Sequence, residues 1–299
     1  MVNLRKKVIS GKTYYYLGHS YRENGRVKYK ETYVGDAPPS ITDMLKIRKE
    51  LLLDIYKEKW FKKFEVIKRA YANDWKRMPL EAREKFLEYF VVKFTYDTNK
   101  IEGSSLSFQD TAELLLRHVS PKNKPIRDIK ETEAHRKVFY EMIAQKGDLT
   151  LEVLLEWHKE LFIETKPDLA GRIRDFGVYI GGSRHLPPPA KEVKQRLTEL
   201  FKWYHKEEEK MNAVELAARM HLKFETIHPF GDGNGRTGRL ILNFILHKKG
   251  YPMSNIKYIN RRGYYNALER ANVNKDETIF VQWFFRMYVK ENTNYLKPQ

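Results

Sequence analysis

The sequence predicts a mainly α-helical protein that begins with a small β-meander. Helix-type periodicity and helix start signals follow one another from about residue 40 onward. Residues 1–36 instead carry turn signals between short tyrosine-rich stretches, and residues 176–189 interrupt the helical pattern with glycines and prolines. Helices therefore form the body of the predicted fold, and the two exceptions are short.

The first 36 residues are typical of a three-stranded meander. Gly11-Lys12 and Asn24-Gly25 are hairpin turn signals between strand-like runs. Residues 36–40, which read Asp-Ala-Pro-Pro-Ser, have the composition of a linker. We therefore predict a small basic β domain over residues 1–36 and a helical domain over residues 37–299.

Short breaks of proline, glycine or asparagine divide the helical domain. Ser40 and Asp43 resemble a capping box for its first helix. Within residues 213–227, apolar side chains recur at steps of three and four, and charged side chains share the opposite face, which is a helical period. The predicted helices begin near Ser40, Pro79, Ser107, Ile126, Leu151, Ala190, Ala213, Arg236, Arg261 and Glu277.

Residues 176–189 read Phe-Gly-Val-Tyr-Ile-Gly-Gly-Ser-Arg-His-Leu-Pro-Pro-Pro. A strand-like run meets a Gly-Gly turn and then three prolines, which predicts a β-hairpin flap. Val178, Tyr179 and Ile180 are suited to pairing with an extended target segment by strand addition. The alternative is an ordinary hairpin that packs on the helices.

Composition limits the possible functions. The 299 residues contain no cysteine, which excludes disulfides, thiolate catalysis and cysteine-ligated metal sites. No apolar run of about 18 residues and no signal-type segment occurs, so we expect a cytoplasmic protein without a membrane segment. The net charge of +17 favours polyanionic partners, whereas abundant lysine and glutamate without cysteine is equally typical of life at high temperature.

The stretch His-Pro-Phe-Gly-Asp-Gly-Asn-Gly-Arg-Thr-Gly-Arg at residues 228–239 concentrates groups with chemical potential. Its glycines satisfy Gly-x-Gly-x-x-Gly, but a predicted helix precedes them where a dinucleotide-binding fold needs a strand. Gly233 and Gly238 have the spacing of a P-loop, yet Arg239 and Leu240 stand where the lysine and hydroxyl should be. Both familiar glycine-rich motifs are therefore excluded.

A metal site is a further alternative for this region. His221, Glu225 and His228 fall on one helical face and are residue types that bind metals. A di-iron bundle needs a second Glu-x-x-His motif, which the sequence lacks. We therefore regard metal binding by these histidines as the weaker alternative.

Anion binding fits residues 228–239 better. The helix predicted from Arg236 has free N–H groups at its start, and the glycines before it let the backbone approach an anion closely. Arg236 and Arg239 lie on one side of that helix and are suited to phosphate oxygens. Asp232 is suited to a hard cation such as Mg²⁺, and His228 to accepting a proton. The segment thus combines a phosphate cradle with a base and a metal ligand.

Residues 228–239 resemble the complete active-site signature of the Fic family, without gap or substitution. Looser similarity extends from about Phe94 to Met287. The resemblance implies a helical fold with a β-hairpin flap over the site and transfer of AMP from ATP to a hydroxyl of a protein side chain. It also implies the residue roles: His228 as general base, Asp232 as Mg²⁺ ligand, the backbones of Gly233, Asn234 and Gly235 as anion hole, and Arg236 and Arg239 as holders of the β- and γ-phosphates.

We further predict that Tyr264 and Tyr265 line the pocket for the nucleotide base. The alternative is that both tyrosines pack in the helical core.

Thr98-Asn99-Lys100-Ile101-Glu102-Gly103 resembles the Ser/Thr-x-x-x-Glu-Gly inhibitory motif of Fic proteins that restrain themselves. The functional residues of this motif are Thr98, Glu102 and Gly103. If Glu102 binds Arg239, the γ-phosphate loses its clamp and the α-phosphorus is not presented for in-line attack. The alternative is a solvent-exposed glutamate before a glycine cap at a helix end.

The N-terminal residues suggest a different class of function. Basic and tyrosine side chains alternate through residues 1–35, a combination suited to phosphate contacts and base stacking. A sheet this small also needs a hydrophobic face, which some of the tyrosines are expected to provide. Nucleic acid is therefore an alternative partner rather than the main one.

The resemblance to the Fic family implies that the chain is a nucleotidyltransferase, a protein adenylyltransferase. It is predicted to use ATP as substrate and Mg²⁺ as cofactor, and to be restrained by Glu102. The predicted target is a Ser, Thr or Tyr hydroxyl of a protein, and this chain is itself a candidate target. The alternatives are a hydrolase that removes AMP with a water activated by Glu102, and a nucleic-acid-binding regulator. The target, the base preference and a homodimer stay open.

Overall fold

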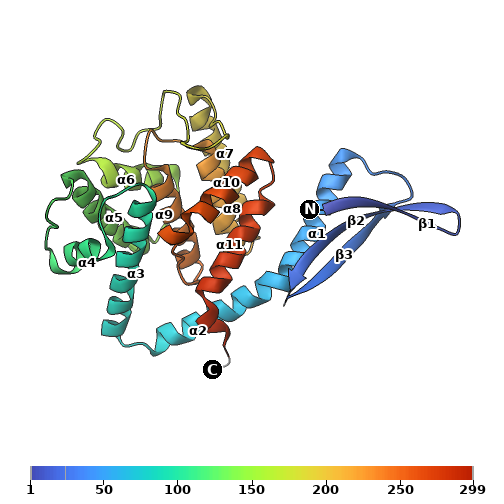
Figure 1. Cartoon of the computed structure of the whole chain (residues 1–299), viewed down its shortest axis with the longest axis horizontal. Helices are drawn as coiled ribbons and strands as arrows, with labels where there is room; N and C mark the ends of the chain where they lie inside the picture. Colours follow the sequence, from blue (N-terminus) through green and yellow to red (C-terminus); the bar gives the residue numbers. More distant parts are fainter. Residues whose placement is uncertain (1, 24, 298–299) are drawn as a thin grey trace. The chain divides into compact units, whose positions relative to one another are not determined.

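The computed structural model describes residues 2–23 and 25–297, and it confirms the predicted mainly α-helical fold with a small N-terminal sheet (Figure 1). The chain divides into two compact units, Met1–Val66 and Ile67–Gln299. The first unit holds the sheet and a helix, and the second holds the helices that carry the predicted site.

The N-terminal unit is an antiparallel meander with one helix on it. Strands β1 (Val2–Ile9), β2 (Lys12–Glu23) and β3 (Arg26–Gly35) pair in the order β1-β2-β3. Gly11 has a φ of 77° in the first turn, a conformation that favours glycine. The second predicted turn includes Asn24, which lies outside the described residues.

Helix α1 (Ile41–Tyr56) belongs to the same unit as the sheet, whereas the sequence placed the domain boundary after residue 36. Leu51 and Ile55 of α1 form a buried cluster with Leu17 of β2. A three-stranded sheet needs an apolar partner for one face, and the first helix provides it. Ser40 caps α1, since its hydroxyl accepts the Asp43 N–H at 3.1 Å.

Helices make up the second unit, and the boundary between the units falls within α2. The predicted helix starts lie within two residues of the observed ones, and the main shift is in α9, which begins at Asn234 rather than Arg236. A short π-helix (Lys57–Phe61) separates α1 from α2, an interruption that the sequence analysis did not anticipate. The observed helices are α2 (Lys62–Arg77), α3 (Leu80–Ile101), α4 (Phe108–Arg117), α5 (Ile126–Ala144), α6 (Leu151–Phe162), α7 (Ala190–Glu207), α8 (Ala213–Ile227), α9 (Asn234–Lys248), α10 (Arg261–Val273) and α11 (Thr278–Glu291).

Helices α8 and α9 form the centre of this unit. The side chains of Leu216, Met220 and Phe224 on α8 are fully buried, as are those of most residues of α9. The charged residues Arg219 and Lys223 of α8 both pair with Glu277, which precedes α11. The motif, residues 228–239, therefore begins in the loop between two buried helices and continues into the first turns of α9.

The predicted β-hairpin over residues 176–189 does not form, because no strand is present in this segment. The segment is a loop that turns where the Ser183 N–H donates to the Ile180 carbonyl at 3.0 Å. The guanidinium of Arg174 donates to the carbonyl oxygens of Phe176 at 2.9 Å and Pro188 at 2.6 Å. This side chain joins the two ends of the flap in place of a strand ladder, and prolines have no N–H with which to build one.

Over the described residues, none of the helices combines the length and apolarity that a membrane crossing requires.

Candidate functional site

The site is built where α8 ends and α9 begins. His228 follows α8 in the left-handed conformation, with a φ of 50°, and its N–H donates to the Phe224 carbonyl at 2.9 Å. The side-chain amide of Asn234 accepts from the Phe230 N–H and donates to the Phe230 carbonyl, both at 2.9 Å. Asn234 thus fixes the loop with its side chain as well as starting α9.

The start of α9 is kept free of side chains. Gly233 has a φ of 82°, and a Cβ on it would lie 2.2 Å from the Phe162 ring. A Cβ on Gly235 would lie 2.2 Å from a carboxylate oxygen of Glu102. The first N–H groups of a helix have no intrahelical acceptor, so a bare backbone here offers them to an anion.

Arg239 and the predicted inhibitory residues meet as the sequence predicts. An Nη of Arg239 donates to Glu102 Oε1 at 2.6 Å, and its Nε donates to the Thr98 hydroxyl at 3.0 Å. Arg239 is 1% exposed. Burial alone lowers the pKa of Arg239, but the Glu102 carboxylate outweighs burial and the pKa is raised. Gly103 has a φ of 95°, which ends α3 directly behind Glu102.

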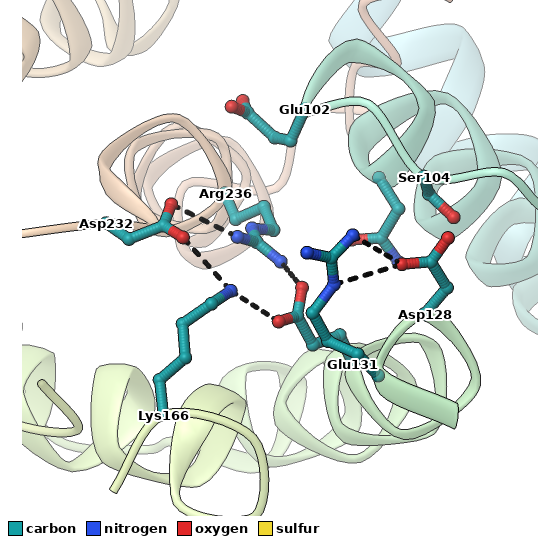
Figure 2. A pocket seen from close by; sticks show the side chains of 9 residues that line it. Glu102, Ser104, Asp128, Glu131, Lys166, Asp232 and Arg236 are labelled. Carbon is teal, nitrogen blue, oxygen red and sulfur yellow. Dashed lines mark hydrogen bonds and ion pairs between the residues drawn. The ribbon is translucent and has the colours of Figure 1, made fainter. Parts of the chain in front are cut away.

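Arg236 and Asp232 lie in a second charged cluster, which Figure 2 shows. Arg236 pairs with Glu131 of α5, and its guanidinium carbon lies 4.4 Å from the centre of the Phe162 ring. Asp232 Oδ2 lies 3.0 Å from the Lys166 ammonium, and Asp232 Oδ1 lies 3.4 Å from Arg236. Burial raises the pKa of Asp232, but its two cationic neighbours outweigh burial, so the carboxyl group is ionised.

His228 has the properties of a neutral base. Burial lowers the pKa of its imidazole to about 4, so that the ring is uncharged at neutral pH. Its Nδ1 lies 3.8 Å from a carboxyl oxygen of Glu225 and has no hydrogen-bond partner in the described part of the chain. Burial also raises the pKa of Glu225 to about 8, which leaves this carboxyl group protonated at neutral pH.

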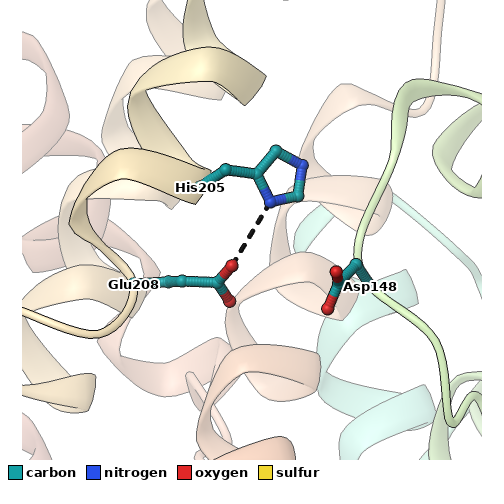
Figure 3. Close-up of side chains that lie close together, drawn as sticks. All are labelled: Asp148, His205 and Glu208. Carbon is teal, nitrogen blue, oxygen red and sulfur yellow. Dashed lines mark hydrogen bonds and ion pairs between the residues drawn. The ribbon is translucent and has the colours of Figure 1, made fainter.

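The metal alternative for His221, Glu225 and His228 is not supported. His221 Nε2 lies 2.8 Å from the Tyr264 hydroxyl, so this nitrogen already has a partner. Among the described residues, the group with metal-ligand spacing is instead Asp148, His205 and Glu208 (Figure 3). Asp148 also pairs with Lys248, at the opposite end of α9 from the motif. That group is therefore separate from the site.

A cavity of about 560 Å³ opens onto His228, Gly235 and Arg239. Tyr264 and Tyr265 line it, but they differ in burial: Tyr264 is 1% exposed, whereas Tyr265 is 44% exposed and donates to the Ile101 carbonyl at 3.3 Å. The aromatic lining suits a planar base, and the role of the two tyrosines in nucleotide binding stays a prediction.

The flap residues lie beside the same cavity. Tyr179 and Ile180 are part of its lining, and the side chain of Tyr179 is 88% exposed. Val178 is half-buried and is not part of that lining. The Ser183 hydroxyl and the Arg184 N–H both donate to Glu269 of α10, which anchors the turn. Target binding by the flap stays a prediction.

Two residues that the sequence analysis missed support the motif. The Nε of Arg174 donates to the His228 carbonyl at 2.8 Å. His158 accepts the Gly171 N–H on Nδ1 at 3.0 Å, so its Nε2 carries the proton and donates to the Asp232 carbonyl at 2.9 Å. The ring of His158 also stacks on Phe230, with centroids 3.6 Å apart. Neither residue belongs to a local motif, so only the folded chain identifies them.

The fold and the site together define a class of protein: a helical domain in which a glycine-rich helix start lies beside a neutral imidazole, and a carboxylate pairs with the second arginine of the motif. Residues 148–246 match the Fic/DOC family, a segment that includes the whole motif. This segment of the chain is a Fic/DOC family domain.

Its relatives carry names that state an activity. The chain is 32% identical over 182 residues to protein adenylyltransferase Fic of Nematostella vectensis, a match that covers 59% of this chain and 42% of that protein. It is 33% identical over 191 residues to protein adenylyltransferase fic-1 of Caenorhabditis elegans, which covers 62% and 37%. The chain thus spans about two-fifths of the length of these curated relatives.

A solved structure covers more of the fold. A Fic domain containing signaling protein from Bacteroides thetaiotaomicron superimposes with a TM-score of 0.70 at 27% identity, over 78% of this chain and 97% of that one. Most of this chain is therefore similar in fold to that Fic-domain protein.

Proposed function

We propose that this protein transfers AMP from Mg-ATP to a Ser, Thr or Tyr hydroxyl of a protein, and that Glu102 restrains the transfer. The observation that carries the proposal is the convergence of His228, the bare backbone of Gly235 and Arg239 on one cavity, with Glu102 bound to Arg239. The names of the relatives support the same reaction.

The residues present fit a magnesium-bound triphosphate. One Nη of Arg239 is buried and has no hydrogen-bond partner in the described part of the chain, and the lack of a Cβ on Gly235 leaves room beside it that the Glu102 carboxylate occupies. Asp232 is an ionised carboxylate of the kind that Mg²⁺ prefers. When bound there, Mg²⁺ neutralises charge that develops on the pyrophosphate leaving group.

The reaction follows from these positions. The target hydroxyl attacks the α-phosphorus of ATP, the new P–O bond forms as the bond from the α-phosphorus to its bridging oxygen breaks, and pyrophosphate leaves. The hydroxyl proton passes to His228, whose ring is neutral because burial lowers its pKa to about 4. Arg236, Arg239 and the first N–H groups of α9 hold the phosphates in line.

Glu102 opposes this arrangement by occupying the γ-phosphate clamp. A carboxylate at 2.6 Å from Arg239 and a γ-phosphate cannot both be its partner, since both are anions in need of the same guanidinium. ATP then binds with its phosphates displaced, so that the α-phosphorus is not presented for in-line attack. The rate of AMP transfer by the resting enzyme is therefore low.

The decisive experiment weighs the intact protein after incubation with ATP and Mg²⁺. We expect little modification of the wild type, addition of AMP to the Glu102→Gly variant, and none in a Glu102→Gly, His228→Ala double variant. Absence of any nucleotide on Glu102→Gly, with or without a cell extract as target source, would refute the proposal. Replacing ATP by other nucleoside triphosphates in the same experiment gives the base preference.

Removal of AMP is an alternative outcome within the same site. Glu102 lines the cavity that contains His228, so its carboxylate is able to orient a water toward a bound phosphodiester. Release of AMP from a pre-modified protein by the wild type, and its loss in Glu102→Gly, would favour this reaction over transfer as the resting activity.

Nucleic-acid binding is a second candidate function, and the N-terminal sheet provides the observation that favours it. The face opposite the Leu17 cluster carries tyrosines and cations: Arg5 lies over the Tyr29 ring at 4.6 Å, and Lys7 over the Tyr16 ring at 4.3 Å. Tyr33 packs 5.5 Å from Tyr16 and is 53% exposed. Tyr21 packs against the Leu17 cluster, as the sequence alternative expected for some of the tyrosines, whereas Tyr16, Tyr29 and Tyr33 are left for the other face.

Exposed tyrosines beside cations suit stacked bases and phosphates. We expect a labelled oligo-dT or oligo-U strand to bind the full chain, and Tyr33→Ala to weaken binding by about 1–3 kcal/mol. Tyr89→Ala, which removes an exposed tyrosine of α3, is the matched control. Equal affinity of all three proteins at low salt would rule out this face as the binding surface.

The remaining partner assignments belong to the same proposal. An ATP-dependent transferase is expected in the cytoplasm, with a protein substrate that includes a second copy of the chain. A homodimer is tested by the molecular mass in solution.

A further inference from the structure

The charged cluster around Asp232 contains two residues that the proposed reaction does not use. Glu131 comes from α5, and Lys166 comes from the turn that follows α6 (Figure 2). The Lys166 ammonium lies 2.5 Å from Glu131 Oε1 and 3.0 Å from Asp232 Oδ2. Glu131 Oε2 pairs with Arg236. The four charges form one network, Asp232 to Lys166 to Glu131 to Arg236.

Both oxygens of Asp232 are engaged in this network. Oδ2 contacts Lys166, and Oδ1 accepts the Gly233 N–H at 2.5 Å and lies 3.4 Å from Arg236. A divalent cation that coordinates Oδ2 must take the place of the ammonium, because two cations cannot share that oxygen at close range. The proposed metal ligand is therefore already paired.

The network is fixed on one side and movable on the other. The side chains of Glu131 and Arg236 are 10% and 5% exposed, whereas those of Lys166 and Asp232 are 21% and 42% exposed. Lysine has a flexible stem and a point charge, so its head group moves at low cost. A polar cavity of about 80 Å³, lined by all four of these residues, gives the ammonium space to move.

We propose that Lys166 is a built-in counter-ion of Asp232 which the divalent cation displaces, and that Glu131 retains the displaced ammonium. Lys166 and Glu131 then act as positioning residues that set the affinity of the metal site. The inference rests on the proposed function, since it takes the metal to be the one that accompanies the nucleotide.

The geometry predicts opposite effects for two substitutions. Lys166→Met removes the competitor, so Asp232 binds the cation more tightly. Glu131→Gln removes the negative charge that Lys166 and Arg236 share with Asp232. Both cations then interact more strongly with Asp232, and the divalent cation binds less tightly. For a partly exposed ion pair we expect a change of about fivefold in either direction. A merely structural role for both residues predicts weaker binding in both variants.

The test measures binding of Mn²⁺ to the full chain in the presence of saturating ADP, with free Mn²⁺ followed by electron paramagnetic resonance. ADP keeps the β-phosphate and has no γ-phosphate for Glu102 to exclude. The variants are Lys166→Met, Glu131→Gln and Asp232→Asn, with Lys130→Met as the control, because it removes the same charge from a surface pair with Glu164. Thermal melting of each variant monitors folding.

Tighter binding in Lys166→Met and weaker binding in Glu131→Gln, with Lys130→Met like the wild type, supports the inference. Unchanged or weaker binding in Lys166→Met overturns it, and this variant decides alone if Glu131→Gln fails to fold. If the wild type and Asp232→Asn instead bind Mn²⁺ with equal affinity, Asp232 is not the metal ligand of the proposed function. The two failures are thus distinguishable, and neither depends on AMP transfer.

Discussion

Removing the Glu102 carboxylate should activate the enzyme and destabilise its nucleotide-free form at the same time. The pair joins a guanidinium that is 1% exposed to a carboxylate that is 25% exposed, at 2.6 Å. Breaking a buried pair costs about 3–5 kcal/mol, and partial exposure of Glu102 reduces this to about 2–3 kcal/mol. The γ-phosphate must overcome the same free energy, so at low ATP we expect Glu102→Gly to raise the transfer rate by about 30- to 150-fold.

The assay measures initial incorporation of α-labelled AMP at subsaturating ATP, together with the melting temperature with and without nucleotide. Glu102→Gln keeps the shape of the side chain and should give an intermediate rate. Glu113→Gln is the control, because it makes the same change on α4, where its carboxylate contacts Gln109. A higher rate without a lower melting temperature of the nucleotide-free protein would contradict the reasoning, as would an unchanged rate.

Further predictions concern single residues. In the Glu102→Gly background, His228→Ala should lower the rate of AMP transfer by about 10²- to 10⁴-fold. Burial lowers the pKa of His228 to about 4, so the rate of Glu102→Gly itself should stay level near neutral pH and fall only as the pH drops toward about 4. Arg174→Met leaves the carbonyls at the two ends of the flap without their donor, so limited trypsin digestion should cut the flap faster than in the wild type. Burial raises the pKa of Glu225 to about 8, above its unfolded value, so its contribution to stability is present below about pH 4.5 and is lost as the pH rises through about 8. Urea unfolding at both ends of this range should therefore show a smaller loss for Glu225→Gln than for the wild type.

Local signals were sufficient for most of the fold. Caps such as Ser40 and Ser107 and breaks before proline-started helices are encoded within a few residues, so the helix starts could be predicted closely. The flap could not, because its strand-like run is held by Arg174 from outside the segment. Glycine has a low helix propensity, so the sequence predicted that α9 begins after Gly235, at Arg236. The glycine backbone can nevertheless adopt the helical conformation, and α9 begins at Asn234.

The residues of the site likewise fall into those that a local motif encodes and those that only long-range contacts bring together. The twelve-residue motif lies in one stretch, so the sequence alone could bring its histidine, aspartate and arginines together, and their roles as base, metal ligand and phosphate clamps stay predictions. The contact between Glu102 and Arg239 spans 137 positions, and only the resemblance to a known motif predicted it. Glu131 contacts Arg236 across 105 positions without any such motif, which is why the sequence analysis missed it.

The paired charges also explain how two buried arginines are stable at the start of one helix. Arg236 and Arg239 are both nearly fully buried, and an unpaired buried cation is costly. Each has its own carboxylate, Glu131 for Arg236 and Glu102 for Arg239, and Lys166 balances Asp232. If the proposed function holds, a phosphate must displace an anion, and a metal ion must displace an ammonium. Restraint of the enzyme and stability of its resting fold then have one electrostatic origin, so any substitution that activates the site by freeing an arginine should also lower the free energy of unfolding of the nucleotide-free protein.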